Sequence, residues 1–283
     1  MERYAQPTSV KEAVELLATD GWVMLAGGTD FYPGLGERPV SESVLDISRI
    51  DALDGISRDD DRAGWRIGAL ATWTQLVRAD CLPPSFDCLK QAALEVGSVQ
   101  IQNRATIVGN ICNASPAADG VPALLVMEAE VELASAQTTR RLGLSKFLQG
   151  NRQTARQPDE IVTGIFIPDS GAQGSSAFFK LGARRYLVIS IAMVAARLEL
   201  DDTGLVKTAA VSVGACSVVA QRLRDLENDL VGARSAQVQS VPEARHLECL
   251  SPIDDVRAPA GYRLEAALEG VRRALAACVE APS

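Results

Sequence analysis

The sequence predicts an α+β protein built from two domains. The chain has 283 residues, more than the roughly 100 to 150 that are most common in a single domain. Helix-like and strand-like segments are mixed up to Pro168, and residues 169–175 then have the glycine and serine content of a linker. Beyond the linker, three long strand-like runs precede two helix-like segments. We therefore expect one domain at 1–170 and a small second domain at 176–283, with a three-stranded antiparallel sheet and helices.

The beginning of the chain predicts a first subdomain of about 1–56. Ser9 and Glu12 have the spacing of a capping box, and apolar residues follow at helical spacing until Gly21. Two short apolar runs come next and predict strands. The expected elements are a helix over 9–20 and strands over 22–26 and 44–47.

A second subdomain is expected over 57–170. Thr72 can cap a helix, and Pro83 and Pro84 break the chain before the next one. The expected helices of this subdomain lie over 73–79, 86–97 and 122–127, and the expected strands over 65–70, 131–134, 140–142 and 161–167. In the second domain we expect strands over 177–182, 189–200 and 205–214 and helices over 222–231 and 262–279.

Composition and charge exclude several classes of partner. The formal net charge is -8 and no Lys/Arg stripe is present, so we expect neither nucleic acid nor an anionic membrane as partner. Apolar runs are far shorter than the roughly 20 residues that span a bilayer, which argues against membrane insertion. The first residues lack the apolar region of a signal peptide, so the expected location is the cytoplasm.

Cysteine and histidine usage gives no catalytic or metal site. The six cysteines include no pair at C-x-x-C spacing, so free thiols are expected rather than zinc or iron-sulfur ligands. His246 is the single histidine, which makes a Ser-His-Asp system hard to build, and its polar sequence neighbours predict a surface position. We therefore predict no catalytic and no metal-binding side chain, and expect a cofactor to supply the chemistry.

Two loops rich in small residues predict phosphate binding. The run 105–120 ends at an apparent helix start, and a glycine turn at 25–30 follows a predicted strand. Small residues let several backbone N–H groups converge on a pyrophosphate without obstruction. Each loop alone is also compatible with a structural role, a tight turn at Gly27 and Gly28 and a helix entry at 115–120. Together they indicate one long ligand held at two places.

In order and spacing, the motifs of this chain resemble the FAD-binding medium subunit of the molybdenum hydroxylases, the xanthine dehydrogenase and carbon monoxide dehydrogenase family. The resemblance extends over nearly the whole chain, and it implies a vanillyl-oxidase-like FAD-binding domain of two subdomains followed by the family's C-terminal flavoprotein domain. The motifs that carry it lie at 26–30, 46–48, 97–104, 105–119 and 176–180.

The resemblance also implies which residues surround FAD. Three groups of residues are implied. The backbone of the first group, 25–31, would lie at the pyrophosphate. The second group would surround the pyrophosphate, the ribityl chain or the ribose, and the third would lie near the adenine or the flavin. The first group is Leu25, Ala26, Gly27, Gly28, Thr29, Asp30 and Phe31; the second is Thr106, Gly109, Asn110, Asn113 and Asp119; the third is Val162 and Lys180. Val108 departs from the family pattern, which usually has a second glycine beside Gly109, so replacing Val108 by glycine is expected to tighten FAD binding.

The implied function is electron transfer within a complex. The chain would accept electrons from [2Fe-2S] clusters of a small partner subunit, with a large molybdopterin-binding subunit upstream, and pass them to an external acceptor. A dimer of heterotrimers is the implied assembly. The alternatives are a stand-alone FAD-dependent oxidoreductase and a non-enzymatic structural subunit that lost its nucleotide.

Overall fold

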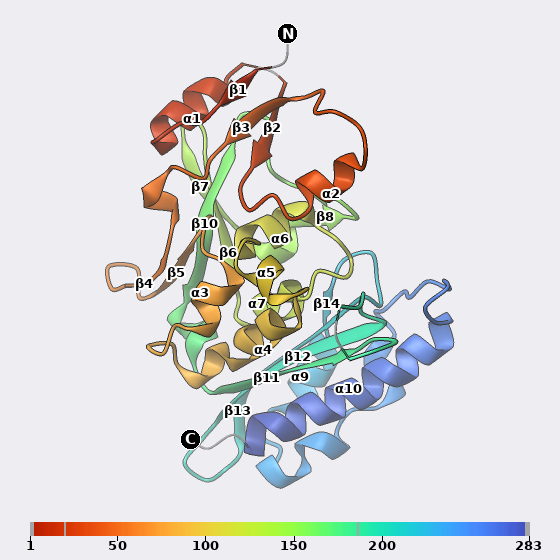
Figure 1. Cartoon of the computed structure of the whole chain (residues 1–283). Helices are drawn as coiled ribbons and strands as arrows, with labels where there is room; N and C mark the ends of the chain where they lie inside the picture. Colours follow the sequence, from red (N-terminus) through yellow and green to blue (C-terminus); the bar gives the residue numbers. More distant parts are fainter. Residues whose placement is uncertain (1–2, 20, 186, 281–283) are drawn as a thin grey trace.

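The computed structural model describes residues 3–19, 21–185 and 187–280 (Figure 1). Asp20, the last residue of the first predicted helix, and the outer ends of the two predicted domains, 1–2 and 281–283, lie outside this description. No helix within the described ranges is long and apolar enough to cross a membrane.

The chain begins with a small parallel sheet. Its strands run in the order β1-β3-β2 and are parallel to one another. Helix α1 starts where predicted, because the Ser9 hydroxyl accepts a hydrogen bond from the Glu12 N–H, and it buries Ala13, Val14 and Leu17. The elements are β1 (Tyr4–Ala5), α1 (Val10–Leu17), β2 (Trp22–Leu25), α2 (Phe31–Leu35) and β3 (Ser43–Asp46).

A five-stranded antiparallel sheet follows, in the order β4-β5-β10-β6-β7. The longest of these strands, β10, lies at the centre and is buried along most of its length. The strands are β4 (Ile56–Asp59), β5 (Gly64–Gly68), β6 (Glu130–Ala134), β7 (Thr139–Gly143) and β10 (Ile161–Pro168). The other elements here are α3 (Trp73–Val77), α4 (Asp87–Glu95), α5 (Val99–Gln102), α6 (Ile107–Asn113), α7 (Gly120–Val126), α8 (Leu144–Phe147) and the hairpin β8 (Leu148–Gly150) and β9 (Gln153–Thr154).

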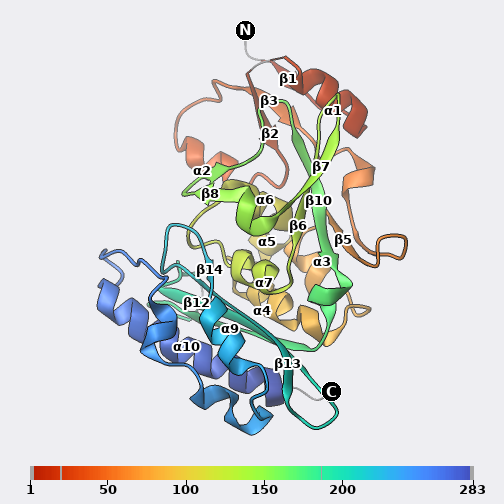
Figure 2. The same ribbon diagram turned by 180° about the vertical axis from the view of Figure 1, so that it is seen from behind.

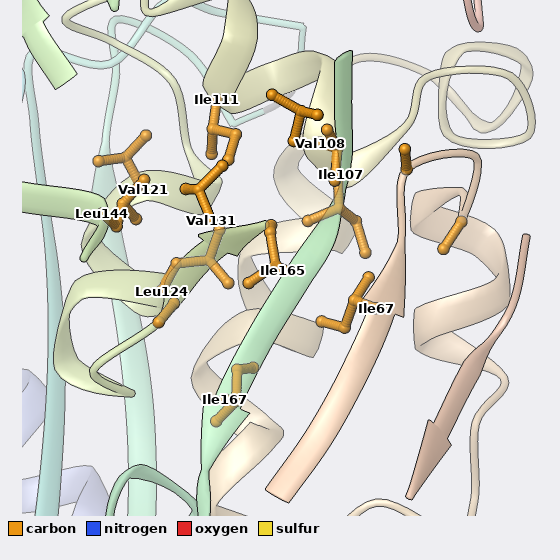
Figure 3. Packing of buried hydrophobic residues seen from close by; sticks show 14 of the residues in the cluster. Ile67, Ile107, Val108, Ile111, Val121, Leu124, Val131, Leu144, Ile165 and Ile167 are labelled. Atoms are coloured by element: carbon orange, nitrogen blue, oxygen red, sulfur yellow. The ribbon is translucent and has the colours of Figure 1, made fainter. Parts of the chain in front are cut away.

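One hydrophobic cluster joins both sheets and the helices between them. Figure 3 shows its centre, where Ile107 and Ile111 of α6 point toward Val131 and Ile165 of the larger sheet. These four side chains are fully buried. Helix α6 is therefore fixed against the sheet by apolar packing, which positions the loop before it.

The C-terminal part contains a second antiparallel sheet between two layers of helices (Figures 1 and 2). The three predicted long strands are present, and a short strand of two residues, β14, extends the meander to four strands. Helix α10 packs on β11 and β12, while α4 and α7 of the preceding region pack on the same sheet. The elements are β11 (Ser175–Leu181), β12 (Ala192–Leu200), β13 (Val206–Gly214), β14 (Gln221–Arg222), α9 (Arg224–Leu230) and α10 (Ala260–Glu280).

His246 does not lie on the surface, so that prediction is wrong. Its side chain is buried, its Nε2 lies 3.0 Å from Asp229 Oδ2, and its Nδ1 accepts a hydrogen bond from the Glu243 N–H. Both ring nitrogens are thus paired inside the protein, which removes most of the cost of burial. Glu243 is one of the polar sequence neighbours, whereas Asp229 is 17 residues away and is brought to the histidine by the fold.

Candidate functional site

A cavity of about 560 Å³ lies where the loop after β2 meets α6 and β10. This volume is in the range of small-molecule and cofactor pockets. Its wall is apolar in large part and carries two charged side chains, Asp30 and Arg156. The apolar and small lining residues besides the predicted ones include Trp22, Met24, Ile47, Ala69, Val96, Ile101, Val108 and Cys112.

The loop from Gly27 to Phe31 presents backbone donors to this cavity. All five N–H groups of this loop lack an acceptor anywhere in the described part of the chain. All five residues line the cavity. Consecutive unpaired N–H groups form an anion-binding concavity, so the loop is suited to an anionic group such as a phosphate.

Gly27 is required by a close backbone contact. A Cβ atom at this position would lie 2.0 Å from the carbonyl oxygen of Arg104. Gly28 has a φ of 75°, in the left-handed region that favours glycine. The two glycines thus let the loop contact the segment that precedes α6. The cavity lies between the loop and α6.

The first turn of α6 adds one more free donor. The Thr106 hydroxyl accepts from the Gly109 N–H at 2.9 Å, and the Ile107 N–H donates to Ala71 O at 3.0 Å. The Val108 N–H has no acceptor within the described residues. The free donor therefore belongs to Val108. Gly109, which the resemblance placed around the pyrophosphate, ribityl chain or ribose, uses its N–H for the helix cap.

Two buried polar atoms of the cavity wall also lack partners. Asn110 Oδ1 and Trp73 Nε1 are both buried and form no hydrogen bond within the described part of the protein. Both residues line the cavity, and both lie close to Gly120, where an added Cβ would be 3.2 Å from Asn110 Oδ1 and 2.5 Å from the Trp73 ring. A buried donor and acceptor without partners are costly, and a polar ligand in the cavity would offset that cost.

The structure brings most of the predicted site residues to this one cavity. Those that line it are Leu25, Ala26, Gly27, Gly28, Thr29, Asp30, Phe31, Thr106, Gly109, Asn110, Asn113 and Val162. Asp119 and Lys180 do not line it. Contact of any of these residues with FAD stays a prediction.

Asp119 and Lys180 instead form a buried ion pair. Lys180 Nζ lies 2.7 Å from Asp119 Oδ2 and also donates to Glu95 O at 3.1 Å. The Ser190 hydroxyl donates to the other carboxylate oxygen of Asp119 at 2.8 Å. Burial raises the pKa of Asp119 despite the neighbouring ammonium group, because the carboxylate has left water. The Asp119 side chain does not cap α7.

Cys112 and Arg156 are among the lining residues that sequence reasoning missed. Cys112 lies four residues after Val108, so helical periodicity places it on the same face of α6 and could have indicated it. Burial raises the pKa of its thiol to about 12, which leaves it protonated and unreactive. Arg156 lies in the turn after β9, and no local pattern distinguishes it from other surface arginines.

With the cavity described, comparison with known proteins identifies the family. Residues 1–170 match the family described as the FAD binding domain in molybdopterin dehydrogenase, which covers more than half of the chain. The chain belongs to this family. Residues 177–278 match the CO dehydrogenase flavoprotein C-terminal domain. The free donors of the cavity, the close approach at Gly27 and the unpaired Asn110 oxygen all fit a dinucleotide such as FAD.

Related dehydrogenase subunits match over most of their length. The nicotinate dehydrogenase FAD-subunit of Eubacterium barkeri is 34% identical over 214 residues, 74% of this chain and 72% of the relative. The 6-hydroxypseudooxynicotine dehydrogenase complex subunit alpha of Paenarthrobacter nicotinovorans is 30% identical, over 96% of this chain and 93% of the relative. A solved carbon monoxide dehydrogenase of Hydrogenophaga pseudoflava superimposes with a TM-score of 0.88 at 27% identity, over 98% of this chain and 96% of that chain.

These findings confirm the resemblance, the α+β fold and FAD as cofactor. The protein is an FAD-binding subunit of a molybdenum hydroxylase and an oxidoreductase of the xanthine dehydrogenase and carbon monoxide dehydrogenase family. The relatives are named as subunits of dehydrogenase complexes, which favours this function over a stand-alone oxidoreductase or a subunit without nucleotide.

Proposed function

We propose that this chain is the medium subunit of a heterotrimeric, cytoplasmic hydroxylase that assembles as a dimer of heterotrimers. In this assembly it takes electrons from the [2Fe-2S] clusters of a small subunit and delivers them to an external acceptor. The large subunit would carry the molybdopterin and the substrate pocket. The two matched segments, 1–170 and 177–278, support a division of the chain into an FAD-binding and a C-terminal domain.

The observation that carries the proposal is the row of free N–H groups from Gly27 to Phe31 in a loop that lines a cofactor-sized cavity. FAD, when bound, supplies the ability to exchange electrons one or two at a time. The chain's own residues bind this cofactor, since the loop and the Val108 N–H hold the pyrophosphate and the apolar wall holds a ring. No side chain near the cavity is needed as an acid or a base.

The experiment is co-expression of this chain with the two reading frames for its candidate partners, followed by purification through a tag on this chain. We expect recovery of three subunits with about one FAD per copy of this chain and bleaching of the flavin absorbance on addition of the hydroxylated substrate. Removal of the small subunit should abolish that bleaching while FAD stays bound.

The same preparation tests the rival functions. Turnover of substrate by this chain alone would show a stand-alone oxidoreductase and contradict the proposal. A chain that stays colourless after incubation with FAD would show a subunit without nucleotide. Recovery of this chain without partners would leave the cofactor assignment intact and overturn the assembly.

A further inference from the structure

Arg156 is the single cation that lines the cavity among the described residues. The other charged lining residue, Asp30, is an anion, and Arg152 offsets its charge from the rim at 3.1 Å. The whole chain has a formal net charge of -8. A dinucleotide brings a pyrophosphate with two negative charges into this environment, so a positively charged group in the wall has a large effect on its affinity.

The Arg156 guanidinium is fixed from one side. Its Nη1 donates to three backbone carbonyl oxygens of the turn before β10, those of Gln157 at 3.0 Å, Pro158 at 3.5 Å and Glu160 at 2.9 Å. No carboxylate within the described ranges forms an ion pair with it, and its Nε and Nη2 have no acceptor there. The side chain is thus oriented by the backbone, and its positive charge acts on the nearby Glu160 carboxylate without a direct ion pair, since Glu160 pairs with Arg140.

The free Nε and Nη2 atoms form the edge with which arginine binds two oxygens at once. Arg140 shows this use in the same region, because its Nε and Nη2 donate to the two carboxylate oxygens of Glu160 at 2.6 and 2.9 Å. Arg156 has the same edge available and lines a cavity instead of facing a carboxylate. A phosphate group matches this edge as well as a carboxylate does.

Arg156 lines the same cavity as the free donors already described. It acts electrostatically on Cys112, which lines the cavity one helical turn after Val108. Four residues of α-helix span about 6 Å, so Cys112 and the free Val108 N–H are that far apart along the axis. A diphosphate held by the Gly27–Phe31 loop and Val108 would therefore share one cavity with the Arg156 side chain.

We propose that Arg156 binds the pyrophosphate of FAD through its Nε–Nη2 edge and supplies the positive charge that the glycine loop lacks. This inference rests on the proposed function, because it takes FAD as the ligand. It assigns a contact that neither loop sequence indicates. Backbone amides then bind one side of the pyrophosphate and Arg156 the other.

The test uses the full chain freed of FAD, with Arg156→Gln, Arg156→Lys and the control Arg141→Gln. Arg141, on β7 and outside the cavity, pairs with Glu130 of β6, and its replacement changes the net charge equally. Hydrogen bonds to a charged group predict roughly 10- to 100-fold weaker FAD binding for Arg156→Gln. Arg156→Lys keeps the positive charge and loses the paired Nε and Nη2 donors, so its FAD affinity should lie between those of Arg156→Gln and the wild type. The FAD affinity of Arg141→Gln should equal that of the wild type.

ADP serves as a second probe because it carries both phosphates without the flavin. Competition by ADP against FAD should weaken in Arg156→Gln by the same factor as FAD binding. Equal FAD affinity in all variants, or weaker FAD binding with unchanged ADP competition, would overturn the inference.

Melting temperatures of the FAD-free variants show whether the turn has loosened. If Arg156→Gln melts like the wild type in the absence of FAD and binds FAD more weakly, the result supports the contact. If Arg156→Gln melts early, Arg156→Lys decides: wild-type FAD affinity in that variant then overturns the inference. A wild-type chain that binds no FAD would contradict the proposed function itself.

Discussion

Arg152 Nη1 lies 3.1 Å from Asp30 Oδ2, and the same atom donates to Asn113 Oδ1 at 2.5 Å. Arg152 belongs to the tip of the β8–β9 hairpin, Asp30 to the loop after β2, and Asn113 to the end of α6. Both views show β8 beside α2 (Figures 1 and 2). One exposed guanidinium thus connects the two loops on either side of the cavity.

This connection predicts a kinetic effect on FAD release. The side chains of Arg152 and Asp30 are 62% and 60% exposed, so their pair adds little to folding stability. Its loss should free the glycine loop to open, and Arg152→Gln is expected to release FAD several-fold faster with an unchanged melting temperature of the FAD-free chain. Stopped-flow release measures the rate. A lower melting temperature with unchanged release would show that the pair serves the fold alone.

The contact at Gly27 predicts a large effect of a single methyl group. Gly27→Ala places a Cβ against the backbone of Arg104, which cannot move aside as a side chain would. We expect about 3 kcal/mol lower stability and loss of FAD binding. Gly34→Ala in α2 is the matched control, since nothing lies within 4 Å of its added Cβ, and it should slightly stabilise the helix. Urea unfolding and FAD titration of both variants measure the difference.

Val108→Gly separates the effect on stability from the effect on affinity. The Val108 side chain is 4% exposed and packs in the main hydrophobic cluster, so its removal should cost about 3 kcal/mol of unfolding free energy. Its N–H is the free donor of the first turn, and the smaller residue should open the approach to it. We expect tighter FAD binding by a less stable protein. Unchanged or weaker affinity would count against a phosphate at this N–H.

The Lys180–Asp119 pair joins β11 to the start of α7, and therefore the C-terminal sheet to the preceding region. Removing one partner leaves a buried charge, so Lys180→Met is expected to cost about 3 to 5 kcal/mol. The double variant Lys180→Met with Asp119→Asn should recover part of this loss. A double-mutant cycle by urea unfolding measures the coupling, and additive effects would mean that the two side chains do not interact in solution. The exposed pair of Arg273 and Glu269 provides a control that should change little.

Glu160 predicts a dependence of stability on pH. The Arg140 guanidinium beside it, with the Gln157 N–H, holds the pKa of its carboxyl below the usual value. A lowered folded-state pKa means that the stabilisation is present above the unfolded pKa of about 4.3 and is lost as the pH falls below it. Glu160→Gln should therefore destabilise the protein at pH 7, and the difference from the wild type should shrink as the pH falls from there through the lowered folded-state pKa. Thermal unfolding across this range measures it, and a pH-independent difference would contradict the pKa direction.

Local patterns were sufficient for much of the fold. The capping box at Ser9 predicted α1, and the apolar run before Gly27 predicted β2 and its loop. The three long strands of the C-terminal sheet were predicted from their apolar runs, and β12, the central one, is buried along most of its length, as a strand covered on both faces is. The two-residue strand β14 could not be predicted, since its pairing with β13 depends on the neighbouring strand.

The sequence by itself determined the family, the cofactor class and the two glycine-containing loops, because each depends on residue types at fixed spacing along the chain. Only the tertiary structure showed that Gly109 uses its N–H for the helix cap while the Val108 N–H stays free, and that Asp119 and Lys180 pair with each other. It also placed Arg156 in the cavity wall. The reason is physical: which N–H groups and charges remain unpaired depends on neighbours that are distant in sequence, and folding alone brings them together.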